Sequence, residues 1–175
     1  MDFQEELTNE LYNAVKTILT DLFSNKEHYY YITLVTDGGA HTPRISAWSY
    51  EVLYGSSSEE QEKIKWSYAD SPYCCWKQER FEKVEKLLSS RKNIWDLNAE
   101  EFETEYQLRF EAMEMAMNRL DQEGIFGINQ KRNDVVVLVE VMPPDHANTA
   151  RAYRMNSTDS EIFSEWLQEV AEPPE

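Results

Sequence analysis

The residue types that most often perform catalysis are few in this chain of 175 residues and lie apart in the sequence. The three histidines, His28, His41 and His146, are isolated, and no Cys or His spacing suits a zinc site. No Gly-x-Ser-x-Gly elbow occurs, and the five glycines form no phosphate-binding loop. The sequence therefore predicts neither a metal nor a cofactor, and it contains no recognisable catalytic constellation.

The two cysteines, Cys74 and Cys75, are adjacent. A disulfide between neighbouring residues needs unusual backbone geometry, so two free thiols in a reducing compartment are the simpler expectation. A basic side chain nearby, such as Lys77, would lower a thiol pKa and activate a nucleophile. A small enzyme that uses His41, Asp70 or Cys74 is therefore kept as an alternative function.

The most distinctive segment runs from residue 65 to residue 76, with the sequence KWSYADSPYCCW. Its aromatic side chains can cover the edge of a core, with Asp70 capping a turn. They can also form a protein interface, because Trp and Tyr offer a large rigid surface and one polar atom. In the second case Trp66 and Tyr73 would be anchors, and Asp70 would meet an Arg or Lys of the partner.

Charge narrows the choice of partners. The chain holds 33 acidic and 17 basic residues, a formal net charge of −16 with His neutral. This balance argues against binding to nucleic acid or to anionic lipid, which cationic clusters recognise. Residues 92–123 alone carry nine acidic residues, including Glu100 and Glu103, against three basic ones. If this acidic segment is helical, its charged side is either a solvated helix face or an anionic surface that steers a basic partner.

Apolar residues at spacings of three and four predict amphipathic helices. The first helix carries its apolar stripe from Leu7 to Leu22, and the longest covers about residues 99–122 behind a capping box of Asn98 and Glu101. A further helix is expected at about 76–88, and a final helix after a cap at Thr158. A short helix is expected after a cap at Ser56 or Ser57.

Three segments, 29–36, 43–50 and 134–141, have the aromatic and β-branched content of strands. The first two are joined by Asp-Gly-Gly, which favours a hairpin. A weaker fourth strand is expected at 151–155. The order of elements predicts an α+β fold: one domain over residues 1–171, with a small, mostly antiparallel sheet of three or four strands packed with several helices. Residues 172–175 are expected to be a loose tail.

The chain begins Met-Asp-Phe-Gln-Glu-Glu, which lacks the basic and apolar regions of a signal peptide. Its longest apolar run, 135–139, is far shorter than the roughly 20 residues that span a bilayer. Together with the two cysteines, these features lead us to expect a cytoplasmic protein without a membrane partner.

Several of these motifs together resemble the bacterial domain-of-unknown-function family 4303. They are the aromatic first strand that ends in Thr36-Asp37, the segment 65–70 (KWSYAD), the run from Phe110 to Leu120, the segment 124–127 (GIFG) and the strand 134–141. The resemblance extends over about residues 3–170. The family's connector is similar to Trp-Ser-Pro-Ala-Glu/Asp-Trp, whereas here Tyr68 stands for the proline and Ser71 for the second tryptophan.

The resemblance implies an immunity protein of bacterial toxin systems, including contact-dependent and type VI secretion effectors. Such a protein is a small cytoplasmic inhibitor, without activity of its own, that binds and neutralises a cognate toxin. By analogy of charge, the toxin would be basic, for example a nuclease. The expected contacts are Trp66, Asp70, Tyr73, Glu100 and Glu103. A non-catalytic scaffold or regulatory module is a further alternative, and a homodimer is left open.

Overall fold

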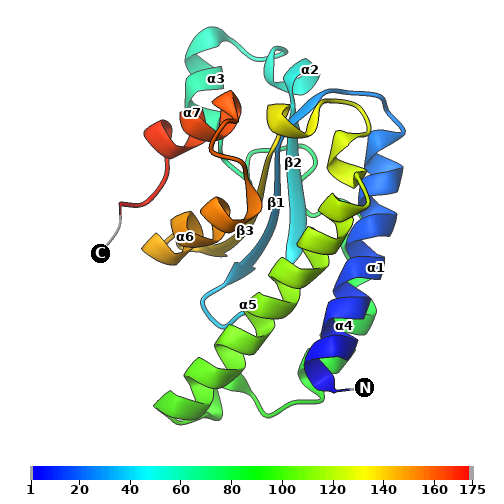
Figure 1. The fold of residues 1–175 in the computed structure, drawn as a ribbon, viewed down its shortest axis with the longest axis vertical. Helices are drawn as coiled ribbons and strands as arrows, with labels where there is room; N and C mark the ends of the chain where they lie inside the picture. The colour runs from blue at the N-terminus through cyan, green and yellow to red at the C-terminus, as the bar shows by residue number, and fades with distance from the viewer. Residues whose placement is uncertain (1, 174–175) are drawn as a thin grey trace.

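The computed structural model describes residues 2–173, which form a three-stranded sheet covered by helices on both faces (Figure 1). The central strand β1 (Tyr29–Asp37) lies between β2 (Arg44–Ser49) and β3 (Val136–Met142). The α+β class is confirmed, and β2 pairs antiparallel with β1 as expected for a hairpin. However, β3 pairs parallel with β1, so the sheet is mixed where a mostly antiparallel one was expected. Parallel neighbours need a long crossover, which the helices between β2 and β3 provide.

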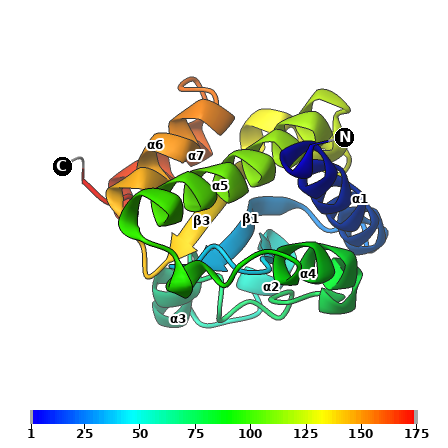
Figure 2. The ribbon, with the colours of Figure 1, turned by 90° about the horizontal axis from the view of Figure 1, so that it is seen from below.

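Helices cover the two faces of this sheet as separate groups. The first group consists of α1 (Phe3–Phe23), α4 (Glu82–Ser89) and α5 (Ala99–Gln122), and α1 and α5 lie side by side (Figure 2). The second group consists of α2 (Tyr50–Leu53), α3 (Ser58–Ile64) and α7 (Glu161–Glu169). The remaining helix, α6 (His146–Met155), packs against β3. Short 3-10 turns, η1 (Gln78–Phe81), η2 (Ile94–Asp96), η3 (Ile125–Gly127) and η4 (Arg132–Asp134), lie between these elements.

The core occupies both faces of the sheet, because eight of the nine residues of β1 are buried. Ile32 and Ala47 belong to the cluster that packs against α1 and α5. Tyr31 and Trp48 belong to the cluster on the opposite face. Neighbouring residues of β1 and β2 therefore pack on opposite faces of the sheet, and both faces are covered, which explains the apolar run of β1.

Residues 151–155 form the end of α6, so the expected fourth strand is wrong. The physical reason is that side chains of this helix and of the residue that follows it bind the outer edge of β3 in place of a strand. Asn148 accepts from the backbone N–H of Val141 (2.8 Å) and donates to its carbonyl (2.9 Å). Asn156 makes the same pair of hydrogen bonds with Val137, at 3.0 and 2.8 Å. Between them, Arg151 donates to the carbonyl of Val139 (3.1 Å). The edge is thereby paired without another strand.

The outer edge of β2 is covered by the segment 65–77, which we call the connector. Its carbonyls at Ser67 and Tyr68 accept from the Trp48 indole and the Ser46 hydroxyl, both at 2.7 Å. The backbone N–H of Cys75 donates to the carbonyl of Ile45 (2.9 Å). This arrangement matches the first interpretation of the connector, in which it covers the edge of the core.

The ends of several helices are set by local chemistry. α5 begins with the predicted capping box at Asn98, and the cap of α3 is Ser57. The last helix is capped by Ser160, whose hydroxyl accepts from the N–H of Phe163, so the predicted cap at Thr158 is wrong. The helix expected from residue 76 begins later, at η1, because Cys75 and Lys77 have positive φ angles of 59° and 49°, which a right-handed helix does not accommodate.

The last described residues contact the domain: the carbonyl of Glu172 accepts a hydrogen bond from the Thr149 hydroxyl at 2.8 Å. The rest of the expected loose tail, residues 174–175, lies outside the described residues. Between residues 2 and 173, no helix has both the length and the apolar composition that crossing a bilayer requires.

Candidate functional site

The aromatic residues of the connector are held by internal hydrogen bonds. The indole N–H of Trp66 donates to Glu169 (2.5 Å), and the ring packs edge-on against Tyr30 at a centroid distance of 5.5 Å. The Tyr73 hydroxyl donates to Glu27 (2.7 Å). Both side chains are half-buried, whereas Asp70 is exposed. The polar atoms of both side chains are therefore used within the domain, and each ring presents only part of its surface.

The predicted contacts are spread along the length of β1. Trp66 lies against Tyr30, in the first residues of β1. Glu100 and Glu103 are exposed in the first turns of α5, beside the end of β1 where Trp95 contacts both Phe102 and His41. At about 3.3 Å per residue, the strand separates the two groups by roughly 25 Å. Trp66 on one side and Glu100 and Glu103 on the other therefore lie near opposite ends of β1.

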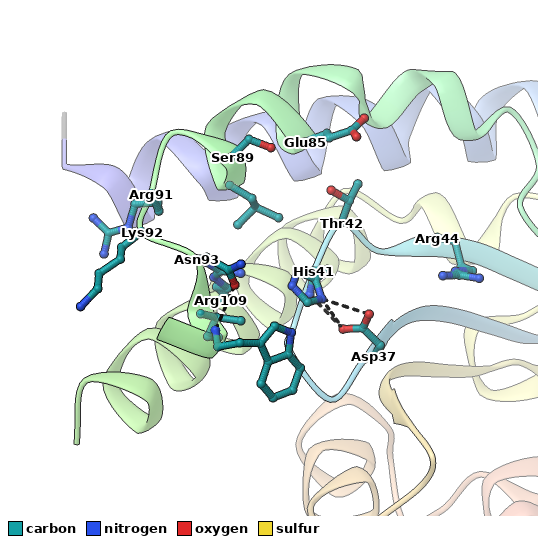
Figure 3. Close-up of a pocket in the computed structure, with 13 residues that line it drawn as sticks. Asp37, His41, Thr42, Arg44, Glu85, Ser89, Arg91, Lys92, Asn93 and Arg109 are labelled. Atoms are coloured by element: carbon teal, nitrogen blue, oxygen red, sulfur yellow. Dashed lines mark hydrogen bonds and ion pairs between the residues drawn. The ribbon is translucent and has the colours of Figure 1, made fainter. Parts of the chain in front are cut away.

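A first cleft, which we call the His41 cleft, opens at the carboxyl end of β1 (Figure 3). Its volume is about 510 Å³, within the range of small-molecule sites. The lining comes from the β1–β2 turn, the end of α4, the loop that leads into η2, and α5. The lining residues are Asp37, His41, Thr42, Arg44, Glu85, Leu88, Ser89, Arg91, Lys92, Asn93, Ile94, Trp95 and Arg109.

At the centre of this cleft His41 is paired with Asp37 (Figure 3). The ring Nδ1 lies 2.9 and 3.0 Å from the two carboxylate oxygens of Asp37, and the backbone N–H of Gly39 donates to the same carboxylate at 3.0 Å. Burial acts to raise the pKa of Asp37, but the hydrogen bonds from His41 and Gly39 outweigh it and lower this pKa. With Nδ1 engaged, Nε2 is the ring nitrogen left for a ligand.

Gly39 permits this packing. A Cβ atom at this position would lie 2.4 Å from Cε1 of His41 and 2.9 Å from Cζ2 of Trp95. Any side chain would therefore push the imidazole and the indole away. At Gly38 an added Cβ meets nothing within 4 Å.

Behind His41, the carboxylate of Glu105 is shared by two arginines, and we call these residues the Glu105 triad. Nε of Arg91 lies 3.2 Å and Nε of Arg109 lies 3.0 Å from Oε1 of Glu105. Arg109 is only 2% exposed and also donates to the carbonyl of Ala40 (3.3 Å), which ties the turn to α5. Burial raises the pKa of Glu105, but the two guanidinium groups outweigh it, so the pKa is lowered.

The enzyme alternative is not assembled as expected. His41 lines the cleft, but neither Asp70 nor Cys74 is among its lining residues. The Sγ atoms of Cys74 and Cys75 lie 3.5 Å apart, and both thiols are free. Burial and the neighbouring thiol raise the pKa of Cys74 to about 11, the reverse of what an activated nucleophile needs.

A second pocket, which we call the tyrosine groove, lies between α2, α3 and α7 and has a volume of about 600 Å³. It is lined by Tyr50, Leu53, Tyr54, Ser58, Gln61, Glu62, Lys65, Trp66, Glu165, Glu169 and Val170. The rings of Tyr50 and Tyr54 are stacked at a centroid distance of 5.5 Å, and Tyr54 is 65% exposed. Trp66 is the one predicted contact residue that lines this groove.

The groove combines these aromatic rings with carboxylates. Nζ of Lys65 lies 2.5 Å from Glu165 and 3.3 Å from Glu169, and it sits 4.9 Å from the centroid of the Trp66 ring. An ammonium group is therefore already held against an indole and two carboxylates. Glu62 lines the groove as well, so its acidic side chains outnumber its basic one.

Sequence reasoning missed most of the groove and the whole of the Glu105 triad. The spacing of four between Tyr50 and Tyr54 is visible in the chain, but Glu165 and Glu169 approach them only through the fold. Similarly, the spacing of four between Glu105 and Arg109 signals a helical ion pair, whereas the contribution of Arg91 depends on the turn after α4.

The fold thus defines a single α+β domain with a mixed sheet, and the His41 cleft and the tyrosine groove are pockets of ligand size on its surface. Residues 11–157 match the family model of the domain of unknown function DUF4303, and the chain belongs to this family. The match confirms the resemblance of the sequence motifs, and it ends before α7, which supplies one wall of the tyrosine groove. No curated protein and no solved structure matches the chain significantly.

Proposed function

We propose that this protein is a cytosolic immunity protein that binds and neutralises a basic toxin, and that the tyrosine groove is the centre of its binding surface. The partner would be the toxin domain of a contact-dependent or type VI secretion effector. The observation that carries the proposal is the position of Lys65, whose ammonium group is held by Trp66, Glu165 and Glu169.

The chemistry of the groove suits a basic side chain of a partner. Tyr54 offers an open aromatic face, and Glu62 is an exposed carboxylate beside it. An Arg or Lys that enters the groove would gain a cation–π contact and a charge-assisted hydrogen bond, both strengthened as water is excluded. An interface of this kind has a central aromatic anchor surrounded by polar contacts.

Charge outside the groove would support the encounter. Glu59 and Glu60 of α3 and Glu161 of α7 are exposed on two of the helices that form it, and the chain as a whole carries a net charge of −16. A negative field of this kind accelerates association with a basic protein. Glu100 and Glu103, which lie near the opposite end of β1, would contribute to this field and not to direct contacts. Asp70 would act in the same way.

The proposal is tested by co-expression with the C-terminal domain of the large protein that the adjacent gene encodes. The chain should protect cells from that domain and co-purify with it. Tyr54→Ala should abolish protection, whereas Tyr153→Ala, which removes a tyrosine of similar exposure (52%) outside the groove, should preserve it. If the chain neither protects nor co-purifies, the proposed function is wrong.

A further inference from the structure

The His41 cleft differs in charge from the rest of this acidic protein. Four basic side chains line it, against two acidic ones, Asp37 and Glu85. The tyrosine groove has the opposite balance, with three acidic side chains and one basic one. At physiological ionic strength, charges more than about 8 Å away are largely screened, so local groups decide the charge of the cleft. The carboxylates that pair with three of its four cations, Glu105 and Glu101, are not among the lining residues, so the side chains that face the cleft are mostly basic. An anion is thus favoured here.

Part of this positive charge is built into the floor of the cleft. In the Glu105 triad a single carboxylate faces two guanidinium groups, so one positive charge is left uncompensated. Arg91 and Arg109 both line the cleft, and burial of Arg109 keeps its charge away from water. Lys92 adds a second cation at the rim, where its ammonium lies 3.7 Å from Glu101.

Next to these cations stands an exposed aromatic ring. Trp95 is 61% exposed, and it contacts Phe102 and His41 at centroid distances of 5.8 and 6.1 Å. Gly39 lets the indole and the imidazole approach the same turn. A flat ring can therefore stack on the indole while a hydrogen bond forms at Nε2 of His41, because Nδ1 is taken by Asp37.

We propose that the His41 cleft binds a small molecule that carries a phosphate group and a flat ring, of the nucleoside monophosphate class. Lys92 and Arg91 hold the phosphate, and Trp95 stacks on the ring. Asn93, which lies between Lys92 and Trp95 in the chain and also lines the cleft (Figure 3), supplies a further polar contact. The site is separate from the tyrosine groove and does not depend on the proposed toxin partner.

The experiment is a calorimetric titration of the full chain with the four nucleoside monophosphates, adenosine and inorganic phosphate. At least one nucleotide should bind saturably. The tightest of them should bind at least tenfold more tightly than either adenosine or phosphate alone. Saturable binding by none of the nucleotides, or a nucleotide affinity no higher than that of adenosine, would overturn the proposal.

Variants test whether the nucleotide binds in this cleft. Lys92→Gln and Trp95→Ala should each weaken nucleotide binding about tenfold or more, and both residues are exposed, so the fold should persist. Lys83→Gln, which removes an exposed lysine of α4 outside the cleft, should leave binding unchanged. Binding by the Lys92 and Trp95 variants at the affinity of the unmodified chain would contradict the assignment.

A glycine pair gives a second, independent readout. Gly39→Ala should displace His41 and Trp95 and weaken nucleotide binding, whereas Gly38→Ala should not, because only the first added methyl meets these rings. Thermal unfolding by circular dichroism separates lost binding from lost folding. If Gly39→Ala folds and binds the nucleotide as tightly as Gly38→Ala, the rings do not form the site.

Discussion

Asn156 binds both polar groups of the Val137 backbone: its Oδ1 accepts from the N–H at 3.0 Å, and its Nδ2 donates to the carbonyl at 2.8 Å. Asn148 repeats this arrangement at Val141, four residues further along β3. The two amides imitate the hydrogen bonds that a neighbouring strand would make. They close the sheet edge, and so the parallel strand β3 remains buried although no further strand between residues 2 and 173 pairs with it.

The first prediction concerns this edge. Asn156→Ala leaves the buried N–H and carbonyl of Val137 without partners, which should lower the free energy of unfolding by about 2–4 kcal/mol. Urea denaturation followed by circular dichroism measures the change. Asn13→Ala, on the exposed face of α1, is the matched control and should have an effect below about 0.5 kcal/mol. Equal effects for the two variants would contradict the assigned role.

The second prediction concerns the Glu105 triad. Glu105→Gln leaves the guanidinium of Arg109 buried without a counter-charge, and the expected loss is about 3–5 kcal/mol at pH 7. Because the folded state lowers the pKa of Glu105, its stabilising effect is present above the ordinary value of 4.5 and is lost as the pH falls towards the folded pKa. Urea denaturation at several pH values should show the difference between the two proteins shrinking below pH 4.5. A constant difference would contradict this.

The third prediction concerns Glu140, which is buried on β3 under the hydroxyls of Tyr31 (2.8 Å) and Thr33 (2.6 Å). Burial raises the pKa of Glu140 despite these two donors, so its neutral form is favoured in the folded state. Its contribution to stability is therefore full below about pH 4.5 and is lost as the pH rises through the folded pKa. Glu140→Gln should remove this loss. The variant should gain stability relative to the unmodified protein between pH 5 and pH 8, and the opposite trend would refute the argument.

The fourth prediction concerns encounter with the proposed toxin. Because acidic residues surround the tyrosine groove, the association rate constant should fall about tenfold or more between 50 and 500 mM NaCl. Stopped-flow mixing measures it directly. The dissociation rate constant should change far less, since the aromatic contacts are not screened. An association rate that does not depend on salt would assign recognition to the aromatic residues alone.

Much of the fold was predictable where the signal is local. The apolar stripe of α1 and the capping box of α5 each lie within one element, and the strand β1 was found within one residue of its end. The end of α6 was mistaken for a strand because residues 151–155 have no strong period of their own. They are the last turns of a helix that begins earlier, after the cap at Asp145, and Arg151 reaches β3 only in the folded chain.

The candidate sites were less predictable for the same reason. Trp66 was expected at a contact surface and does line the tyrosine groove, but Glu165 and Glu169 join it from the far end of the chain. Tyr73 was expected to be a contact, yet its hydroxyl donates to Glu27. His41 was noted as a side chain that could perform chemistry. The sequence did not indicate that Arg91 and Arg109 line the same cleft, because they come from the loop after α4 and from α5 rather than from the turn that carries His41.

The central claim, that a basic protein binds in the tyrosine groove, is tested most directly by the dissociation constant of the complex with the toxin domain encoded next to this chain. Isothermal titration calorimetry should give a Kd for Tyr54→Ala at least about thirtyfold weaker than that of the unmodified protein, as for an anchor residue worth about 2 kcal/mol. Tyr153→Ala should leave the Kd unchanged. Equal affinities for the Tyr54→Ala and Tyr153→Ala variants would contradict the account.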